Sequence, residues 1–280
     1  MSAADWTGIE VPQDIRLVVA DMDGTLLDSR GRLSPENLDA IRRMTDKGYC
    51  FVPTSGRNRE QIPQALQQFP GIRYLITLSG ACVTQLPEGK ALFRHPLSRE
   101  HANRLLRVGK QQGAAVLLYT PEGVLLEHGA LEQRQDRALL EDAIGICRPV
   151  EDAQAFCLAE DVQVEKAVFF CRDAAQETRL HQALDDGTFQ LCVSAENCLE
   201  VTARGIHKAT GIRALLLRLK LLPEQVLTIG DSGNDVSMLE LTPNSFAVAN
   251  AMPEAKRAAR HLTVSNDQHV ALRIARLLGI

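Results

Sequence analysis

The chain has 280 residues, enough for one large core or for a core domain and a smaller one. Apolar residues make up 45% and charged residues 24%, an ordinary composition for a globular protein. Its 31 basic and 35 acidic side chains give a net charge of −4, so no strong positive field exists to hold nucleic acid or anionic lipid. No stretch reaches the roughly 18 uninterrupted apolar residues that span a bilayer, so neither nucleic acid nor a membrane is an expected partner.

The N-terminal segment and the cysteines indicate a cytoplasmic protein. Residues 1–14 carry three acids and no apolar run, unlike a signal peptide or a membrane anchor. The seven cysteines are scattered without a C-x-x-C pair, which argues against a zinc site or a thioredoxin-like pair. We expect them to be buried, reduced thiols.

Strands and helices alternate in the first part of the chain. Residues 15–20 form a nearly continuous apolar run, which suits a strand buried on both faces of a parallel sheet. A helix follows, with Ser34 as its N-cap, Pro35 in its first turn and Gly48 at its end. The further elements expected here are strands at 49–52 and 74–78 and a helix near 58–68.

The same alternation returns after residue 208. The elements expected here are helices at 208–220, 236–241, 251–260 and 269–278, and strands at 226–229, 246–248 and 262–264. Such alternation is typical of a doubly wound α/β fold. We therefore predict a Rossmann-like parallel-sheet core formed by residues 1–82 and 203–280.

Residues 83–202 differ and are predicted to form an inserted α+β domain. The expected strands are 91–94, 115–119, 124–127, 166–171, 190–194 and 199–202, and the expected helices are 99–112, 131–143 and 174–184. The turn at 121–123 contains Pro and Gly and joins two of these strands, which predicts an antiparallel hairpin.

Two acids, Asp21 and Asp23, follow the first predicted strand within the stretch 21–27. Ligands of open α/β sheets bind beyond the carboxyl ends of the strands. Side chains two residues apart point the same way if the backbone stays extended. Like charges so close together are costly, and a divalent cation offsets that cost. The alternative is a solvated acidic turn, but the preceding apolar strand and the Gly-Thr that follows favour a cation site.

A second acidic loop, residues 230–235, follows the predicted strand 226–229. Asp231 and Asp235 lie beside glycines that allow the backbone to approach a ligand. The alternative is that Asp235 only caps the short helix after it. Taken together, the two acidic loops indicate an oxygen-rich site that suits Mg²⁺ better than zinc.

Thr54 and Lys208 are candidates for holding a phosphate. Thr54 ends the second predicted strand, where its hydroxyl and nearby backbone N–H groups could bind phosphate oxygens. Most such threonines, however, are turn formers or caps. Lys208 could neutralise the charge of a transferring phosphoryl group, whereas a lone lysine at a helix end is commonly solvated.

In this order, the motifs resemble the haloacid dehalogenase (HAD) superfamily, and within it the Cof-like phosphatases with a large α/β cap. The resemblance covers nearly the whole chain. The stretches that carry it are 21–27, 54–57, Lys208, 230–235, 249–253 and 265–267. It implies that residues 83–202 form a cap that covers the site and selects the substrate.

The resemblance also implies a covalent mechanism. Asp21 would be the nucleophile that forms an aspartyl-phosphate, and Asp23 would protonate the leaving oxygen and then activate water. The residues expected to bind the phosphoryl group or the substrate are Thr54, Ser55, Arg57, Lys208 and Asn234. Arg57 is equally a candidate for a structural salt bridge.

Mg²⁺ is the cofactor that the resemblance implies. Its ligands would be the Asp21 carboxylate, the Asp23 backbone carbonyl and Asp231, with Asp235 as a direct or water-bridged support. Metal and Lys208 together would balance the negative charge of phosphoryl transfer. We therefore predict a Mg²⁺-dependent phosphatase whose partner is a small-molecule phosphate ester, such as a sugar phosphate.

Two positions depart from the family pattern. Residues 79–81 read Ser-Gly-Ala where the family often has Asn-Gly-Ala, and His269 stands where it often has Gly. Both positions lie near the substrate entrance in such proteins, so they bear on substrate identity and not on the chemistry. We expect His269 to be a surface residue at a helix start.

Three alternatives remain at this point. A phosphotransferase or phosphomutase would use the same Asp21, Asp23 and Lys208 but pass the phosphoryl group to a sugar hydroxyl instead of water. A dehalogenase is disfavoured because a metal site and Asp23 have no part in its chemistry. A catalytically silent binding protein is disfavoured because such a protein need not keep the complete set of acids, Thr54 and Lys208. The sequence names neither the substrate nor the oligomeric state.

Overall fold

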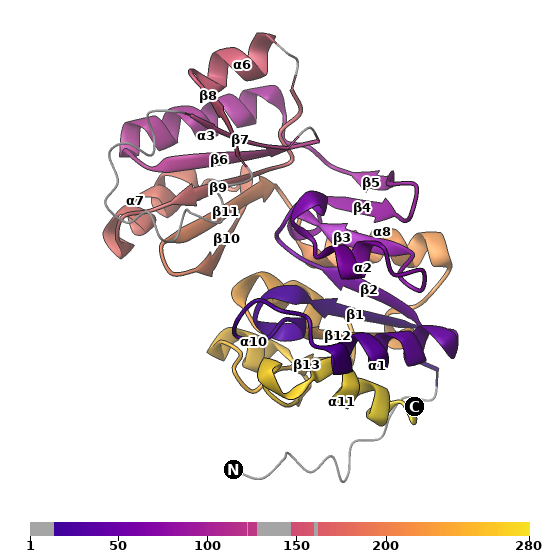
Figure 1. The fold of residues 1–280 in the computed structure, drawn as a ribbon. Helices are drawn as coiled ribbons and strands as arrows, with labels where there is room; N and C mark the ends of the chain where they lie inside the picture. The colour runs from indigo at the N-terminus through magenta and orange to yellow at the C-terminus, as the bar shows by residue number, and fades with distance from the viewer. Residues whose placement is uncertain (1–13, 122, 128–146, 160–161) are drawn as a thin grey trace. The chain divides into compact units, whose positions relative to one another are not determined.

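The computed structural model describes residues 14–121, 123–127, 147–159 and 162–280 (Figure 1). The chain divides into two compact units. We call Arg94–His207 the inserted unit, and the chain up to Phe93 together with Lys208–Ile280 the core unit. Each unit has a sheet of its own, and each is described by itself below.

An eight-stranded sheet, in the order β14-β13-β12-β1-β2-β3-β4-β5, forms the centre of the core unit. Its strands are β1 (Leu17–Asp21), β2 (Cys50–Thr54), β3 (Tyr74–Thr77), β4 (Cys82–Gln85), β5 (Lys90–Arg94), β12 (Val226–Gly230), β13 (Asn244–Ala247) and β14 (His261–Leu262). Neighbours are parallel from β14 to β3, and β4 is antiparallel to β3. Every residue of β1 is buried, as its apolar run requires. The predicted α/β fold class is confirmed, and the sheet continues past residue 82 to β5.

Helices flank this sheet (Figure 1). They are α1 (Pro35–Asp46), α2 (Gln64–Gln67), α8 (Lys208–Leu219), α9 (Val236–Leu239), α10 (Pro253–Ala258) and α11 (Val270–Leu277). α1 begins where the sequence predicted, because the Ser34 hydroxyl accepts the backbone N–H of Asn37 at 3.1 Å. The Asn37 side chain in turn accepts the N–H of Ala271, which ties α1 to the start of α11.

The helix predicted near residues 58–68 is wrong in extent. The structure has a 3₁₀ turn at Arg59–Gln61 and then only the four residues of α2. Pro63 explains the break, because it has no N–H to donate and holds the preceding Ile62 in an extended conformation.

The predicted start of the inserted domain, residue 83, falls within β4. This strand pairs with β3 in the core sheet, from Thr77 opposite Cys82 to Tyr74 opposite Gln85. The sequence pattern did not reveal β4, because the connection before it is unusually tight: Leu78, Ser79 and Gly80 all have positive φ angles. The chain leaves the core unit only after β5 has been added to the sheet.

The inserted unit contains a six-stranded sheet in the order β10-β11-β9-β6-β7-β8. Its strands are β6 (Ala115–Thr120), β7 (Gly123–Glu127), β8 (Cys147–Val150), β9 (Lys166–Phe170), β10 (Phe189–Ala195) and β11 (Cys198–Ala203), and its described helices are α3 (Arg99–Gln112), α6 (Ala153–Ala159) and α7 (Ala174–Leu184). β6 and β7 form the predicted antiparallel hairpin. β8 and α6 were not predicted, and the helix predicted at 131–143 lies outside the described residues.

All seven cysteines are free thiols. Four are buried as expected, but Cys147, Cys192 and Cys198 are half-buried. Across the described ranges, no helix combines the length and apolar character needed to cross a membrane.

Candidate active site

The parallel strands bring the predicted residues to one edge of the core sheet. Asp21 and Thr54 are the last residues of β1 and β2 and stand opposite each other in the ladder. Gly230 ends β12, which pairs with β1 on its other side. The loops that follow these strands therefore meet at their carboxyl ends, where open α/β sheets bind ligands.

Three carboxylates gather there. One oxygen from each of Asp21, Asp231 and Asp235 lies within 4.8 Å of the others. Asp21 and Asp235 are buried, whereas Asp231 is half-buried. Lys208, the first residue of α8, is also buried, and its ammonium donates to Asp21 Oδ1 and, at 2.5 Å, to Asp235 Oδ1. One buried cation thus faces three acids, which leaves an excess of negative charge.

Burial and this excess of negative charge both raise the pKa values of the acids. Burial, followed by the nearby Asp235, raises the pKa of Asp21 well above its ordinary value, although Lys208 opposes the shift. Burial and then Asp235 raise the pKa of Asp231 to about 6. Burial on its own would lower the pKa of Lys208, but Asp21 and Asp235 hold it above the ordinary value. A divalent cation at the cluster would favour the ionised form of Asp21 and Asp231.

The donor set fits Mg²⁺. Only oxygen donors make up the cluster, and hard cations prefer carboxylate and carbonyl oxygens over nitrogen or sulfur. Burial, together with the neighbouring Asp235, raises the pKa of Asp21 and Asp231, and a bound cation would offset both effects. These two side chains would therefore hold the metal.

Asp235 has a different role, because its oxygens are already engaged. Oδ2 accepts the backbone N–H groups of Asp231 and Ser232, both at 2.9 Å, while Oδ1 accepts from Lys208. The carboxylate therefore fixes the loop that carries Asp231 and the ammonium that faces Asp21. Gly230 is required beside it, because a Cβ there would lie 2.6 Å from Asp235 Cγ.

The side chain of Asp23 does not join the three-carboxylate cluster, contrary to the expectation that it would point the same way as Asp21. Residues Met22–Leu26 form an irregular helical turn in which Asp23 is extended (φ −74°, ψ 124°) but Gly24 has φ +76°, so the strand does not continue past Asp21. The Asp23 carboxylate instead accepts two hydrogen bonds from Arg57, from Nε at 2.8 Å and from Nη2 at 2.5 Å. Both side chains are partly exposed, at 48% and 38%.

The remaining predicted residues surround this arrangement. Thr54 Oγ1 is buried and has no hydrogen-bond partner among the described residues, so it is available to a ligand. The hydroxyl of the buried Ser55 accepts the backbone N–H of Arg57 at 3.1 Å. Asn234 Oδ1 accepts from the Ser232 hydroxyl at 3.0 Å.

Several residues that organise the site were quoted in motifs but given no role. The Thr25 hydroxyl donates to Asp231 Oδ1 at 2.6 Å. Asn250 donates to the Gly24 carbonyl at 2.8 Å, and its own side-chain oxygen accepts the backbone N–H of Asn266. The motifs at residues 249–253 and 265–267 are therefore hydrogen-bonded to each other and to the loop after β1. Gly24 has φ +76°, and a Cβ there would lie 2.5 Å from Asp231 Oδ2.

The two departures from the family pattern lie in different surroundings. Ser79 is buried, has φ +54° and donates its N–H to the Ser55 carbonyl at 3.1 Å. His269 is the N-cap of α11, with its side chain 39% exposed and Nδ1 2.9 Å from the Ser34 hydroxyl. The expected helix-start position of His269 is what the structure shows.

The comparisons with known proteins agree with this site. A family model for haloacid dehalogenase-like hydrolases matches residues 18–274. HMP-PP phosphatase from Klebsiella pneumoniae strain 342 is 28% identical over 256 residues, which cover 90% of both chains. Phosphatase YwpJ from Bacillus subtilis strain 168 is 24% identical over 282 residues, covering 91% of this chain and 96% of the relative.

Solved structures share the fold. A haloacid dehalogenase-like hydrolase from B. subtilis has a TM-score of 0.82 at 22% identity, and the HAD subclass IIB sugar phosphatase BT4131 has a TM-score of 0.81 at 20% identity. Each match covers 94% of this chain and 99% of the other. The chain therefore belongs to the haloacid dehalogenase-like hydrolases, as a phosphatase of the Cof-like type that its motifs predicted.

Proposed function

We propose that the protein is a Mg²⁺-dependent phosphatase that hydrolyses a small phosphorylated metabolite through an aspartyl-phosphate on Asp21. The observation that carries this proposal is the buried contact of Lys208 with Asp21 beside Asp231, at the carboxyl end of β1. A buried lysine and two metal-binding carboxylates supply the positive charge and the nucleophile that phosphoryl transfer needs.

In the proposed first step, an Asp21 oxygen attacks phosphorus, and the bond from phosphorus to the leaving oxygen breaks. Lys208 and the Thr54 hydroxyl stabilise the phosphoryl oxygens, and Asp23 gives a proton to the leaving oxygen. Bound Mg²⁺ would neutralise charge on the phosphoryl group and help to orient it. In the second step, Asp23 takes a proton from water, which attacks the same phosphorus and releases phosphate and free Asp21.

Arg57 holds the Asp23 carboxylate as a hydrogen-bond acceptor, oriented for the second step, in which it takes a proton from water. For the first step, one Asp23 oxygen must leave Arg57 to carry the proton that it donates. Its guanidinium forms a bidentate pair with the carboxylate, a geometry that fixes direction better than a single contact. Arg57 is itself held by the Gln61 carbonyl at 3.3 Å. Of the two interpretations from the sequence, the salt bridge is observed, and contact of Arg57 with the substrate stays a prediction.

A phosphotransferase or phosphomutase remains the second candidate, since it needs the same residues. The fate of the aspartyl-phosphate separates the two activities. A phosphatase releases inorganic phosphate at the rate at which substrate is consumed, whereas a transferase requires an added sugar hydroxyl for turnover.

The inserted unit is the proposed selector of substrate. Relatives and structural neighbours include an HMP-PP phosphatase and a sugar phosphatase, so both substrate classes belong in a screen. We propose a panel of sugar phosphates, nucleotides, cofactor phosphates and HMP-PP, with released phosphate as the readout. We propose that the protein acts in a reducing compartment such as the cytoplasm, because its cysteines are free thiols.

The mechanism is tested with p-nitrophenyl phosphate in Mg²⁺ and in EDTA. We expect hydrolysis with Mg²⁺ and none with EDTA, and Asp21→Asn should abolish turnover while preserving the circular dichroism spectrum. Robust activity without metal would reject the proposed mechanism, and near-wild-type rates in Asp21→Asn would remove that residue as the nucleophile.

A further inference from the structure

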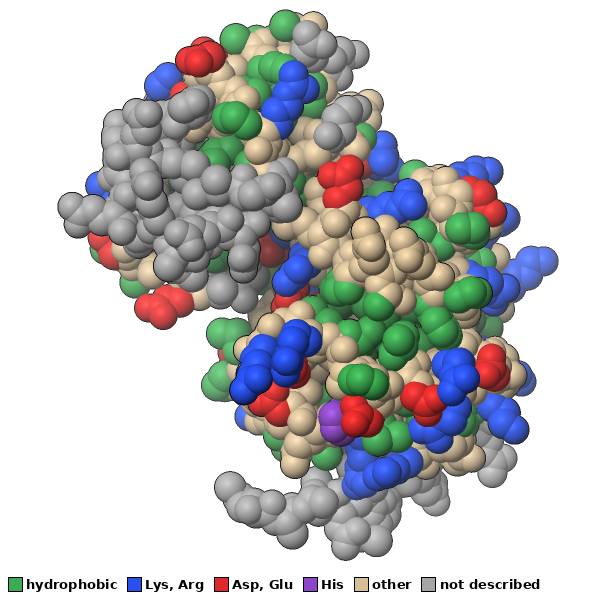
Figure 2. Space-filling view, in the orientation of Figure 1, with side chains coloured by type: hydrophobic (Ala, Val, Ile, Leu, Met, Phe, Trp, Pro, Cys, Tyr) green, Lys and Arg blue, Asp and Glu red, His purple; other side chains and the backbone are tan. Residues whose placement is uncertain are grey.

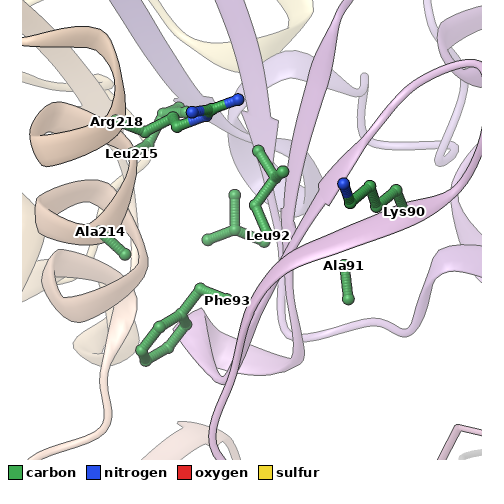
Figure 3. Close-up of a pocket in the computed structure, with 8 residues that line it drawn as sticks. Lys90, Ala91, Leu92, Phe93, Ala214, Leu215 and Arg218 are labelled. Atoms are coloured by element: carbon green, nitrogen blue, oxygen red, sulfur yellow. The ribbon is translucent and has the colours of Figure 1, made fainter.

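A cavity lies in the core unit, away from the three carboxylates of the candidate active site. It has a volume of about 340 Å³ and is formed by β4, β5 and α8. Its lining residues are Val83, Lys90, Ala91, Leu92, Phe93, Ala214, Leu215 and Arg218 (Figure 3). Arg218 is ten residues beyond Lys208 on α8, which places it about 15 Å further along the helix axis. The cavity is therefore distinct from the catalytic site.

Two cations share this cavity. Figure 3 shows the Arg218 guanidinium reaching from α8 above Leu92, and the Lys90 ammonium on β5 turned toward the same residue. Both side chains are exposed, and neither forms an ion pair or a hydrogen bond with any residue in the described ranges. No acidic residue lines the cavity to balance them. Positive charges that face one concave surface without a counter-charge attract an anion.

The remainder of the lining is apolar. Leu92 and Phe93 are half-buried and pack against the hydrophobic core, and Leu215 on α8 is buried. A cavity with an apolar floor and a few charged groups at its rim is typical of small-molecule sites, whose volumes run from about 300 to 1,000 Å³. The volume here lies at the lower end of that range, which suits a small ligand.

We propose that this cavity binds a small organic anion with a hydrophobic body, such as a medium-chain carboxylate. Arg218 and Lys90 would contact the anionic group, and Leu92, Phe93 and Leu215 would cover the apolar part. Arginine binds a carboxylate through two parallel hydrogen bonds, which is the contact expected to give most of the selectivity. A second copy of the chain is a poor occupant, because a two-fold contact would bring the same cations face to face.

The proposal is tested with octanoate as the probe and isothermal titration calorimetry on the full chain. We expect octanoate to bind at one site, and 1-octanol, which lacks the charge, to bind at least tenfold more weakly. Arg218→Gln should weaken octanoate binding about tenfold, the equivalent of one charge-assisted contact. Arg213→Gln is the matched control, because Arg213 is exposed on the same helix but does not line the cavity.

Two further arms separate this cavity from the catalytic site. Ala214→Phe fills the cavity from α8 and should abolish octanoate binding, with its melting temperature measured to show that the variant is folded. Inorganic phosphate at a tenfold excess should leave octanoate binding unchanged. No octanoate binding by the wild type would overturn the proposal, as would equal binding by the Arg218→Gln and Arg213→Gln variants or displacement by phosphate.

Discussion

The replacement of Asp235 by asparagine provides a sharp test of the proposed division of roles within the carboxylate cluster. The Asp235 carboxylate accepts from two backbone N–H groups through one oxygen and from the Lys208 ammonium through the other. An asparagine amide has one oxygen to offer. In either orientation, its NH₂ group must face a donor, either the buried ammonium or the two N–H groups.

The expected cost is about 3 kcal/mol, because removing one partner of a buried, hydrogen-bonded charge pair leaves donors without acceptors. For a unit of this size, this corresponds to a drop in Tm of about 6–12 °C. We expect that drop in thermal unfolding followed by circular dichroism at pH 7.5 in EDTA, where no metal contributes to stability.

Asp231→Asn is the matched control. The pKa of about 6 for Asp231, against an ordinary value of 3.8, means that its ionisation opposes folding by about 2–3 kcal/mol. A folded-state pKa above the unfolded value makes stability fall as pH rises from about 4 to 6, so this cost is fully present at pH 7.5. In EDTA, Asp231→Asn should therefore match or exceed the wild-type Tm, although it loses Mg²⁺ binding. Equal destabilisation by the two substitutions would refute the assignment of Asp235 as the organiser and Asp231 as the metal ligand.

Three other outcomes follow from the same geometry. Arg57→Ala should lower kcat about 10- to 100-fold with a smaller change in KM, because Asp23 loses the bidentate contact that orients it; steady-state kinetics that show an unchanged kcat would leave the pair only a structural role. Thr54→Val should preserve or slightly raise Tm, since the buried hydroxyl has no partner in the described protein, but should lower kcat/KM at least tenfold; a variant as active as the wild type would contradict phosphoryl binding by that hydroxyl. The Mg²⁺ association constant, measured by calorimetry, should fall as the pH drops through about 6, because protonated Asp231 cannot bind metal. An association constant that stays the same from pH 7.5 to pH 5 would exclude Asp231 as a ligand.

The sequence by itself determined the elements whose signals are local. The apolar run before Asp21 produced a buried strand, and Ser34 and Pro35 set the start of α1. The parallel order of strands placed the acidic loops at one edge of the sheet, since strands joined by helical crossovers must end on the same side. Residue types at the strand ends indicated a hard-cation site, and the resemblance to the haloacid dehalogenase superfamily implied the phosphatase chemistry.

The tertiary structure decided what depends on contacts between distant segments. The pairing of Asp23 with Arg57 could not be read from the chain, because β1 ends at Asp21 and the irregular turn that follows, not a continued strand, sets the direction of the Asp23 side chain. The hydrogen bond from the Asn250 side chain to the Gly24 carbonyl joins residues 226 positions apart in the sequence.

The role of Asp235 also emerged only in three dimensions. Its sequence position was compatible with a metal ligand or a helix cap. In the structure its side chain makes no cap hydrogen bond to α9 and instead accepts from two backbone N–H groups of its own loop and from Lys208. A carboxylate can accept only as many hydrogen bonds as the fold directs toward it. That number is fixed by tertiary packing, and the identity of the residue does not reveal it.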